Sequence, residues 1–279
     1  MAMSFPKKII YSLSLDGRWA CLDGISYREK IRYIFSKYIN LFFNRKSINY
    51  LGEKFSYDNR ATPATLQSYP YEIKFLDEFM NLNSARNILD IGANIGQFSR
   101  TISTLFPHLK VFSFEPNPVI FETLQNNVRH LPVQCINCGV SPKSSSTLFF
   151  VPGYSGKGSF ISENAVINLG DMDSEEVKVQ SILLDESAVE RFDLPPVFDL
   201  VKIDVEGFEY EVLESLPALT CRFLYVEISL ARSHGYDFPE LLSRIQSKFG
   251  KFTVLYCDGI DARKSGQTIG SLLVKVEDV

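Results

Sequence analysis

The sequence predicts an α/β fold built on a mostly parallel sheet, and three observations support this prediction. A short apolar run, 88–91, ends abruptly in a glycine turn, 92–96, and a helical pattern follows at once. About twenty residues later a second apolar run, 111–114, ends in Glu115. Strand and helix patterns then alternate, which is typical of parallel strands with helices on both faces of the sheet.

The expected elements follow in order along the chain. Strands are predicted at 88–91, 111–114, 133–138, 198–203 and 222–228, with helices at 96–106, 117–129 and 207–216. Strand 198–203 is mostly apolar, as a central strand covered on both faces should be. An antiparallel pair, 147–151 with 176–183, is expected within an insertion at about 141–197, and a second pair, 251–256 with 271–276, at the end of the chain.

Residues 1–60 predict a helical extension to a main domain at 61–279. Aromatic and aliphatic residues recur at helical spacing from Tyr27 to Phe42, and Arg and Lys lie between them. Such a helix can dock on an anionic membrane surface or pack its aromatic face on the main domain. We favour packing, because a basic solvated face is common. Residues 56–70 resemble a connecting loop, and a helix is expected from Tyr71 to Met80.

The bulk properties of the 279-residue chain exclude some classes of protein. A net charge of −4 gives no reason to expect a nucleic acid as a partner. No apolar run is long enough to span a bilayer, and residues 1–10 lack the features of a signal peptide. The five cysteines lack disulfide spacing, and Cys135 and Cys138 read as buried strand thiols rather than metal ligands. We therefore expect a cytoplasmic protein without a metal, of undetermined oligomeric state.

The glycine turn and Glu115 together predict a nucleoside-containing cofactor across the first two strands. Gly92 and Gly96 let the backbone approach a ligand, and the N–H groups of the next helix face the turn. Glu115 is placed to accept two hydrogen bonds from a ribose diol. A nicotinamide-dependent oxidoreductase shares these features, but its turn reads G-x-G-x-x-G, whereas this one reads G-x-x-x-G.

Three motifs resemble those of the FkbM-type methyltransferases. They are LDIGANIGQFS (89–99), FEPNP (114–118) and VKIDVEGFE (201–209), in the family's order and spacing over about 85–230. The resemblance implies a class I S-adenosylmethionine (SAM) methyltransferase fold, a Rossmann-like, seven-stranded sheet whose last strand is antiparallel. It also implies SAM as cofactor and O-methylation of a small-molecule or glycan hydroxyl, often on a sugar or polyketide. A non-catalytic binding module with the same fold remains an alternative.

The motifs also assign candidate cofactor residues beyond the two glycines and Glu115. Asp90 either faces the cationic amino end of SAM or caps the turn. Asn94 either tolerates a left-handed backbone or bonds the methionine moiety, and Asn117 either caps the next helix or contacts adenosine. Asn137 and Cys138 end the third strand, where class I enzymes usually hold the edge of the adenine.

The acceptor is expected over the carboxyl ends of the later strands. Asp204 or Glu206 is predicted to orient or deprotonate the acceptor, although Glu206 and Glu209 also suit a helix N-terminus. Glu227 ends the next strand and is a further candidate for this pocket, but with Asp204 it makes a poor metal site. His234, in the following loop, is a candidate general base, although loop histidines are more often simply exposed to solvent.

Overall fold

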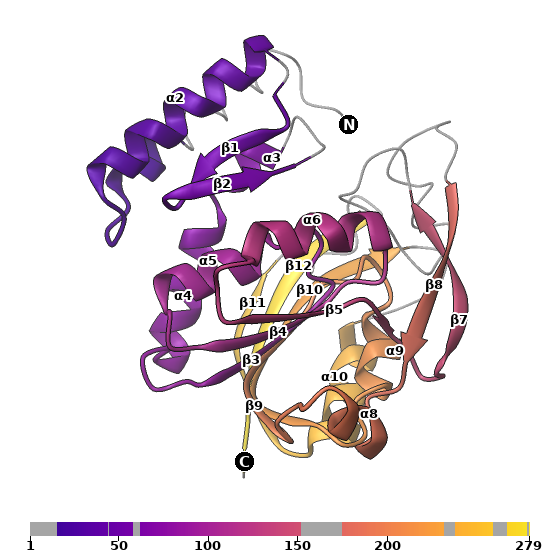
Figure 1. Cartoon of the computed structure of the whole chain (residues 1–279). Coiled ribbons are helices and arrows are strands. Elements are labelled where there is room, and N and C mark those ends of the chain that lie inside the picture. The colour runs from indigo at the N-terminus through magenta and orange to yellow at the C-terminus, as the bar shows by residue number, and fades with distance from the viewer. Residues whose placement is uncertain are drawn as a thin grey trace.

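The computed structural model describes residues 16–43, 45–57, 62–151, 175–231, 238–258, 267–277 and 279. A twisted seven-stranded sheet forms the centre of the molecule (Figure 1), with strand order β11-β12-β10-β9-β3-β4-β5. Only β12 runs against its neighbours. The predicted fold class is therefore confirmed. The strands are β3 (Asn87–Ile91), β4 (Lys110–Phe114), β5 (Val133–Ile136), β9 (Val197–Ile203), β10 (Thr220–Ala231), β11 (Phe252–Asp258) and β12 (Gln267–Val276).

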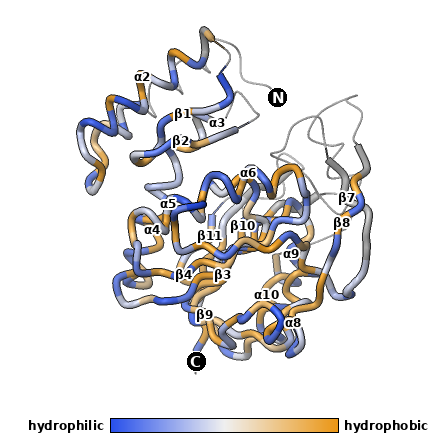
Figure 2. Tube along the Cα trace, viewed as in Figure 1, coloured by the Kyte–Doolittle hydropathy of each residue, from blue (hydrophilic) through white to orange (hydrophobic). Residues whose placement is uncertain are grey.

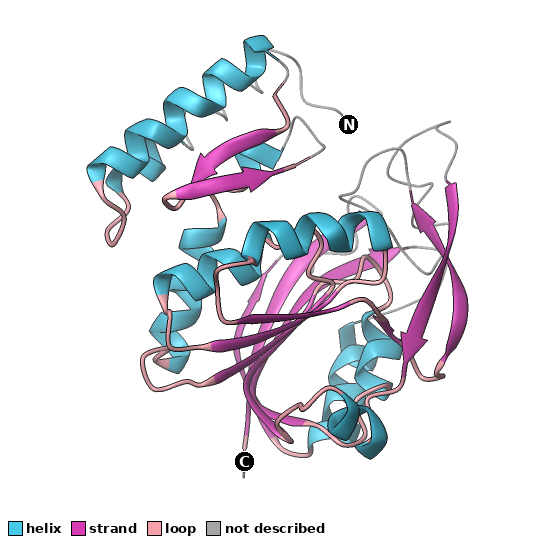
Figure 3. Cartoon of the chain, in the orientation of Figure 1, coloured by secondary structure: helices cyan, strands magenta, loops and turns pink. Residues whose placement is uncertain are grey.

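Helices cover both faces of this sheet (Figure 3). Each face of the sheet has its own hydrophobic core, because successive side chains of a strand point to opposite faces. Ile88 of β3 packs in one core and Leu89 packs in the other. One side carries α4 (Tyr69–Met80), α5 (Gln97–Leu105) and α6 (Pro118–Val128), and the other carries α8 (Glu186–Arg191), α9 (Glu209–Glu214) and α10 (Phe238–Phe249). Figure 2 shows the hydrophobic strands enclosed between these layers.

The expected insertion forms a small second sheet beside the main one. Strands β7 (Ser145–Val151) and β8 (Glu175–Ile182) pair antiparallel, as predicted, with Thr147 opposite Val179. A two-residue strand, β6 (Gly139–Val140), adds to β8 in parallel and connects this sheet to the end of β5. Neither β6 nor helices α8 and α10 were expected from the sequence.

The N-terminal part is not only helical. Helix α2 (Tyr27–Phe43) is followed by a hairpin of β1 (Ser47–Tyr50) and β2 (Glu53–Ser56), and α3 (Thr62–Thr65) lies where a loop was expected. The hairpin turns at Leu51 and Gly52, both with positive φ. Its four-residue strands are too short for an alternating pattern to be visible in the sequence. The domain boundary at residue 60 stays a prediction.

The hairpin ties the N-terminal part to α5 and α6. The Tyr50 hydroxyl lies 2.7 Å from the Thr101 hydroxyl of α5. The side chain of Asn127, in α6, accepts a hydrogen bond from the Ser56 N–H at 2.7 Å and donates one to the Ser56 carbonyl at 2.9 Å. A buried aromatic cluster that includes Trp19 packs on Ile95 and Ile120 of the main domain.

Helix α2 does not pack as expected. Tyr33 is fully buried, but Tyr27, Ile31 and Phe35 are at least half exposed. The expectation that the aromatic face of this helix packs on the main domain is therefore wrong for these three residues. The helix instead buries Lys37, which forms an ion pair with Asp16.

Candidate functional site

The two glycines of the turn are required by contacts within the protein. Gly92 has a φ of +86°, and a Cβ added there would lie 1.8 Å from the carbonyl oxygen of Asp204. Gly96 has a φ of +88°, and its Cβ would lie 2.8 Å from Cδ1 of Leu124 on α6. We expected ligand approach to explain these glycines, but the close approach is between the turn and its neighbouring elements. Their role toward a cofactor stays a prediction.

Glu115 holds the turn against the end of β4. Its Oε2 accepts a hydrogen bond from the Asn94 N–H at 3.0 Å, and its Oε1 accepts one from the Asn117 N–H at 2.8 Å. The side chain is buried, and burial raises its pKa to about 7 although both hydrogen bonds lower it. Asn137 Nδ2 braces the same segment by donating to the carbonyls of Glu115 (2.9 Å) and Pro116 (3.0 Å).

The other candidates near the turn have local structural roles. Asn94 has a φ of +51°, and its Oδ1 accepts from the Ile95 N–H at 2.7 Å. Asn117 caps α6, with Oδ1 accepting from the N–H groups of Val119 (3.0 Å) and Ile120 (3.5 Å). Cys138 is half-buried, and burial raises the pKa of its thiol. Contact of these residues with a cofactor stays a prediction.

Asp90 lies fully buried beneath the turn. Its Oδ2 accepts from the Ser99 hydroxyl at 2.5 Å, and that hydroxyl lies 2.7 Å from the Ser113 hydroxyl. Its Oδ1 has no hydrogen-bond partner among the described residues, and burial raises the pKa of the carboxyl. The nearest cation is Lys202, whose Nζ is 3.9 Å from Oδ1.

Lys202 is the centre of a polar row that crosses the sheet. Strand register places Ser113, Asp90, Lys202 and Tyr225 side by side on β4, β3, β9 and β10. The Lys202 ammonium is buried and donates to Asp204 Oδ2 at 2.9 Å. Burial lowers its pKa, but the nearby carboxylates outweigh this and hold the pKa well above its usual value. Sequence reasoning missed Lys202, although a lysine within an apolar central strand is a visible signal.

Two carboxylates extend this row to the carboxyl edge of the sheet. Asp204 follows β9 directly, and Glu227 lies on β10, one position beyond the pairing of Val226 with Ile203. Both side chains are partly exposed. The charge of Asp204 and then burial raise the pKa of Glu227 to about 8, while Lys202 lowers it. The pair therefore combines an ion-paired carboxylate with a neighbour that holds its proton near neutral pH.

Helix α4 lies on the same face of the sheet as α5 and brings two further ionisable side chains to this row. Glu72 Oε1 is buried without a hydrogen-bond partner in the described part of the chain, and burial raises the pKa of this carboxyl to about 7. Tyr69, one turn earlier, has a pKa raised by burial and then by the charge of Glu72. Neither residue carried a sequence signal, because both lie outside the motifs.

The remaining acceptor candidates divide into three cases. Glu206 has a φ of +51°, and its charge contributes to the raised pKa of Glu227, so the two lie near each other. Glu209 is buried, and its Oε1 accepts from the Gly207 N–H at 2.8 Å, which favours the helix-terminus interpretation. His234 lies outside the described residues. No group of three or more potential metal ligands occurs among the residues that the structure describes.

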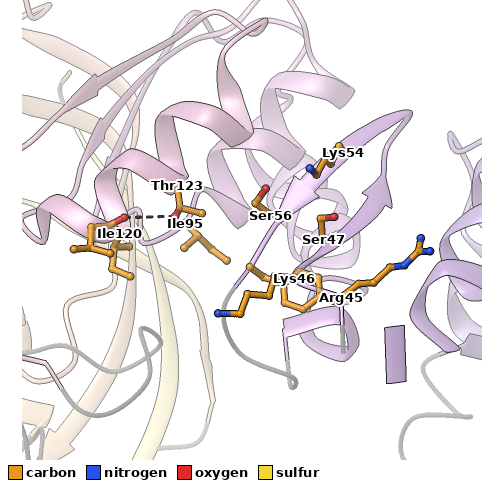
Figure 4. Close-up of a pocket in the computed structure, with 10 residues that line it drawn as sticks. Arg45, Lys46, Ser47, Lys54, Ser56, Ile95, Ile120 and Thr123 are labelled. Carbon is orange, nitrogen blue, oxygen red and sulfur yellow. Dashed lines mark hydrogen bonds between the residues drawn. The ribbon is translucent and has the colours of Figure 1, made fainter. Parts of the chain in front are cut away.

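A pocket of about 610 Å³ lies between the hairpin and the start of α6 (Figure 4). Its wall includes Ile95, which follows Asn94 of the turn, and Ile120. Arg45, Lys46 and Lys54 line it, and its wall contains no acidic side chain from the described part of the chain. In Figure 4 the Lys46 side chain points in the direction of Ile120, whereas the Arg45 side chain extends away from Ile120. Such a pocket suits an anionic group next to the turn.

The raised pKa of Glu72 leads to a prediction about the stability of the protein. The unfolded carboxyl ionises near pH 4.5, whereas the folded one holds its proton to about pH 7. The free energy of unfolding should therefore fall between these values as pH rises. We expect Glu72→Gln to remove part of this fall, so that the variant is more stable than the wild type by roughly 1–3 kcal/mol near pH 8.

The measurement is urea unfolding from about pH 4 to pH 8, with Glu78→Gln on the exposed side of α4 as control. If the stability of the Glu72→Gln variant depended on pH as that of the wild type does, the raised pKa of Glu72 would be contradicted.

The residues at the turn fit SAM, the cofactor that the motifs imply. The carboxylate oxygens of Glu115 each use one lone pair on a backbone N–H, which leaves acceptor capacity for a ribose diol. The unsatisfied Oδ1 of Asp90 lies behind the same turn. SAM supplies a sulfonium-activated methyl group when it is bound at such a site.

Comparison with known proteins agrees with this geometry. Residues 90–251 match the model of the methyltransferase FkbM domain, which is more than half of the chain. Methyltransferase sdnD of Sordaria araneosa is 32% identical over 164 residues, which are 50% of this chain and 63% of that protein, so the match spans less than two thirds of the relative's length. The hexuronic acid methyltransferase AglP of Haloferax volcanii is 35% identical over 158 residues, 55% of this chain and 60% of that protein.

A solved structure also shares the fold. The N-terminal domain of EvdMO1 with SAH bound superposes with a TM-score of 0.50 at 12% identity, covering 91% of this chain and 99% of that one. At this identity the likeness concerns the fold alone. The chain belongs to the FkbM methyltransferase family, and its domain is a SAM-dependent methyltransferase domain with SAM as cofactor.

Proposed function

We propose that the protein transfers the methyl group of SAM to a hydroxyl of a sugar or sugar-containing acceptor, and that Glu227 takes the hydroxyl proton. The observation that carries this proposal is the pair of partly exposed carboxylates, Asp204 and Glu227, at the carboxyl ends of adjacent strands. In open α/β sheets, ligands bind at this edge. An alkyl hydroxyl is a weak nucleophile, so a base beside it accelerates its attack on the methyl carbon.

The two carboxylates are suited to different roles. Asp204 Oδ2 accepts a hydrogen bond from the Lys202 ammonium at 2.9 Å, so this oxygen is already engaged in an ion pair. Glu227 has a pKa of about 8, near the range in which a general base works best. Asp204 then orients the hydroxyl, and Lys202 holds the Asp204 side chain in place. The proposal thus gives the role of base to Glu227, whereas the sequence pointed to Asp204 or Glu206, and it keeps Asp204 in the acceptor site.

The acceptor class rests on two supporting facts. A relative that is 35% identical is named a hexuronic acid methyltransferase, and a hexuronic acid carries a carboxylate beside its hydroxyls. The pocket beside the turn presents Arg45, Lys46 and Lys54. An acidic sugar would therefore find counter-charges close to the cofactor turn.

Cofactor binding should depend on Glu115. We expect Glu115→Ala to weaken the affinity for S-adenosylhomocysteine by roughly a hundredfold. The reason is that the variant loses the two hydrogen bonds that the Glu115 side chain is proposed to accept from the ribose hydroxyls. Titration calorimetry measures this, and Glu122→Ala, an equal charge change at an exposed position on α6, should bind as the wild type does. Equal affinities in all three proteins would remove Glu115 from the cofactor site.

The activity itself is tested with methyl-labelled SAM and a panel of acceptors. Uronic acids, neutral sugars and a polyketide alcohol are incubated with the full chain, and label in the acceptor is followed by mass spectrometry. Transfer to uronic acid hydroxyls supports the proposal, and transfer only to the polyketide alcohol contradicts the acceptor class. Binding of SAM without consumption for any acceptor would favour a non-catalytic binding module.

A further inference from the structure

Helix α2 presents an unusual surface to solvent. Tyr27, Ile31 and Phe35, spaced four residues apart, are 75%, 50% and 67% exposed, and Phe43 at the end of the helix is 70% exposed. Residues at this spacing lie on one face of a helix. Contiguous exposed apolar side chains of this size are uncommon on a protein surface that contacts only water.

The inner side of α2 explains why its apolar residues face outward. Lys37 Nζ is buried and bonds Asp16 Oδ1 at 2.7 Å and Gln67 Oε1 at 3.2 Å. Asn40 Nδ2 is also buried and donates to the Ser47 carbonyl at 2.6 Å. These polar side chains anchor the helix to the rest of the N-terminal part. Its orientation is therefore set by specific bonds, and the outward apolar face is a fixed feature of the fold.

The charges on the outer face have one sign. Arg28 and Arg32 are exposed beside the apolar residues. The one acidic residue of α2, Glu29, accepts a hydrogen bond from the Ser26 hydroxyl at 2.8 Å at the helix start. Arg45 and Lys46 follow the end of the helix and are also exposed. An aromatic and aliphatic face bordered by arginines fits the boundary between the headgroups and acyl chains of an anionic bilayer.

We propose that the outer face of α2, made of Tyr27, Arg28, Ile31, Arg32, Phe35 and Phe43, docks the protein on an anionic lipid surface. The helix lies in the plane of the interface, with its aromatic and aliphatic side chains among the acyl chains and its arginines at the lipid phosphates. Contact of this kind is peripheral, because the helix does not cross the bilayer. Among the described residues, no helix has the length and apolar character needed to cross a membrane.

The test is co-sedimentation of the full chain with vesicles of phosphatidylcholine alone and of equimolar phosphatidylcholine and phosphatidylglycerol. We expect binding to the anionic vesicles that weakens as salt is added. Ile31→Glu with Phe35→Glu should weaken it by at least about tenfold, because two inserted apolar side chains are lost. Arg28→Gln with Arg32→Gln should weaken it by roughly tenfold and reduce the dependence on salt.

The matched control is Val197→Glu with Val254→Glu, which adds the same two charges at partly exposed apolar positions of the sheet, away from α2. This control should bind vesicles as the wild type does, and thermal unfolding should show that all variants are folded. The proposal would be overturned if the wild type did not bind anionic vesicles, or if Ile31→Glu with Phe35→Glu bound them as well as the wild type does. If the wild type did not bind vesicles but was a dimer in light scattering, and Ile31→Glu with Phe35→Glu made it monomeric, the face would instead bind a second copy of the chain.

Discussion

Replacing Glu227 by Gln is expected to lower kcat by about 10²–10⁴-fold while leaving the affinity for SAM unchanged. The amide keeps the size of the side chain but accepts no proton, and Glu227 lies on β10, two strands from the β3 turn. Steady-state kinetics with the best acceptor measures kcat, and titration calorimetry measures cofactor affinity.

The pH dependence of turnover gives a second readout for Glu227. A base must be unprotonated to act, so kcat in the wild type should rise with pH and level off above about 8, the value to which Asp204 and burial raise this pKa. The variant should lose this limb of the profile. Glu122→Gln makes the same change at an exposed position on α6 and serves as control, with the wild-type profile expected. A Glu227→Gln enzyme with wild-type kcat and pH profile would show that another group takes the proton.

Replacing Gly92 by Ala should unfold the protein or reduce its free energy of unfolding by more than about 4 kcal/mol. The new Cβ would lie 1.8 Å from the carbonyl oxygen of Asp204, which belongs to the backbone and is held by the hydrogen bond from the Asp204 N–H to the Ile91 carbonyl at 3.0 Å. Neither the turn nor the end of β9 can move without breaking the pairing of the central strands. Urea unfolding measures the change.

Gly250→Ala separates this clash from ordinary backbone strain. Gly250 also has a positive φ, +76°, but nothing lies within 4 Å of its added Cβ. Its substitution should therefore reduce stability by only about 1 kcal/mol. Equal losses at the two positions would mean that the left-handed backbone, and not the contact with Asp204, makes glycine necessary at position 92.

Sequence patterns were sufficient for the sheet because its signals are local. The apolar runs at 88–91, 111–114 and 198–203 appear as β3, β4 and β9, within one residue at each end. The small antiparallel pair and the C-terminal pair were also predicted correctly. Each of these elements combines a periodic pattern with a clear boundary, which is the information that a single sequence carries best.

The hairpin and the buried charges depend on contacts between distant segments. Strands β1 and β2 are stabilised by packing of Tyr50 and Phe55 in a cluster that includes Ile95, far along the chain. Glu72 comes near Lys202 and Asp204 only because α4 packs on the sheet. Lys202 is tolerated in a central strand because Asp90 and Asp204, from two different segments, surround its ammonium.

The sequence by itself therefore determined the fold class, the family and the positions of the main strands along the chain, since strand periodicity and the three motifs are properties of short segments. Only the tertiary structure decided why Gly92 must be glycine, which acid holds its proton near neutral pH, and which face of α2 meets solvent. The physical reason is that steric exclusion, pKa and burial are set by atoms that come together only when the chain is folded.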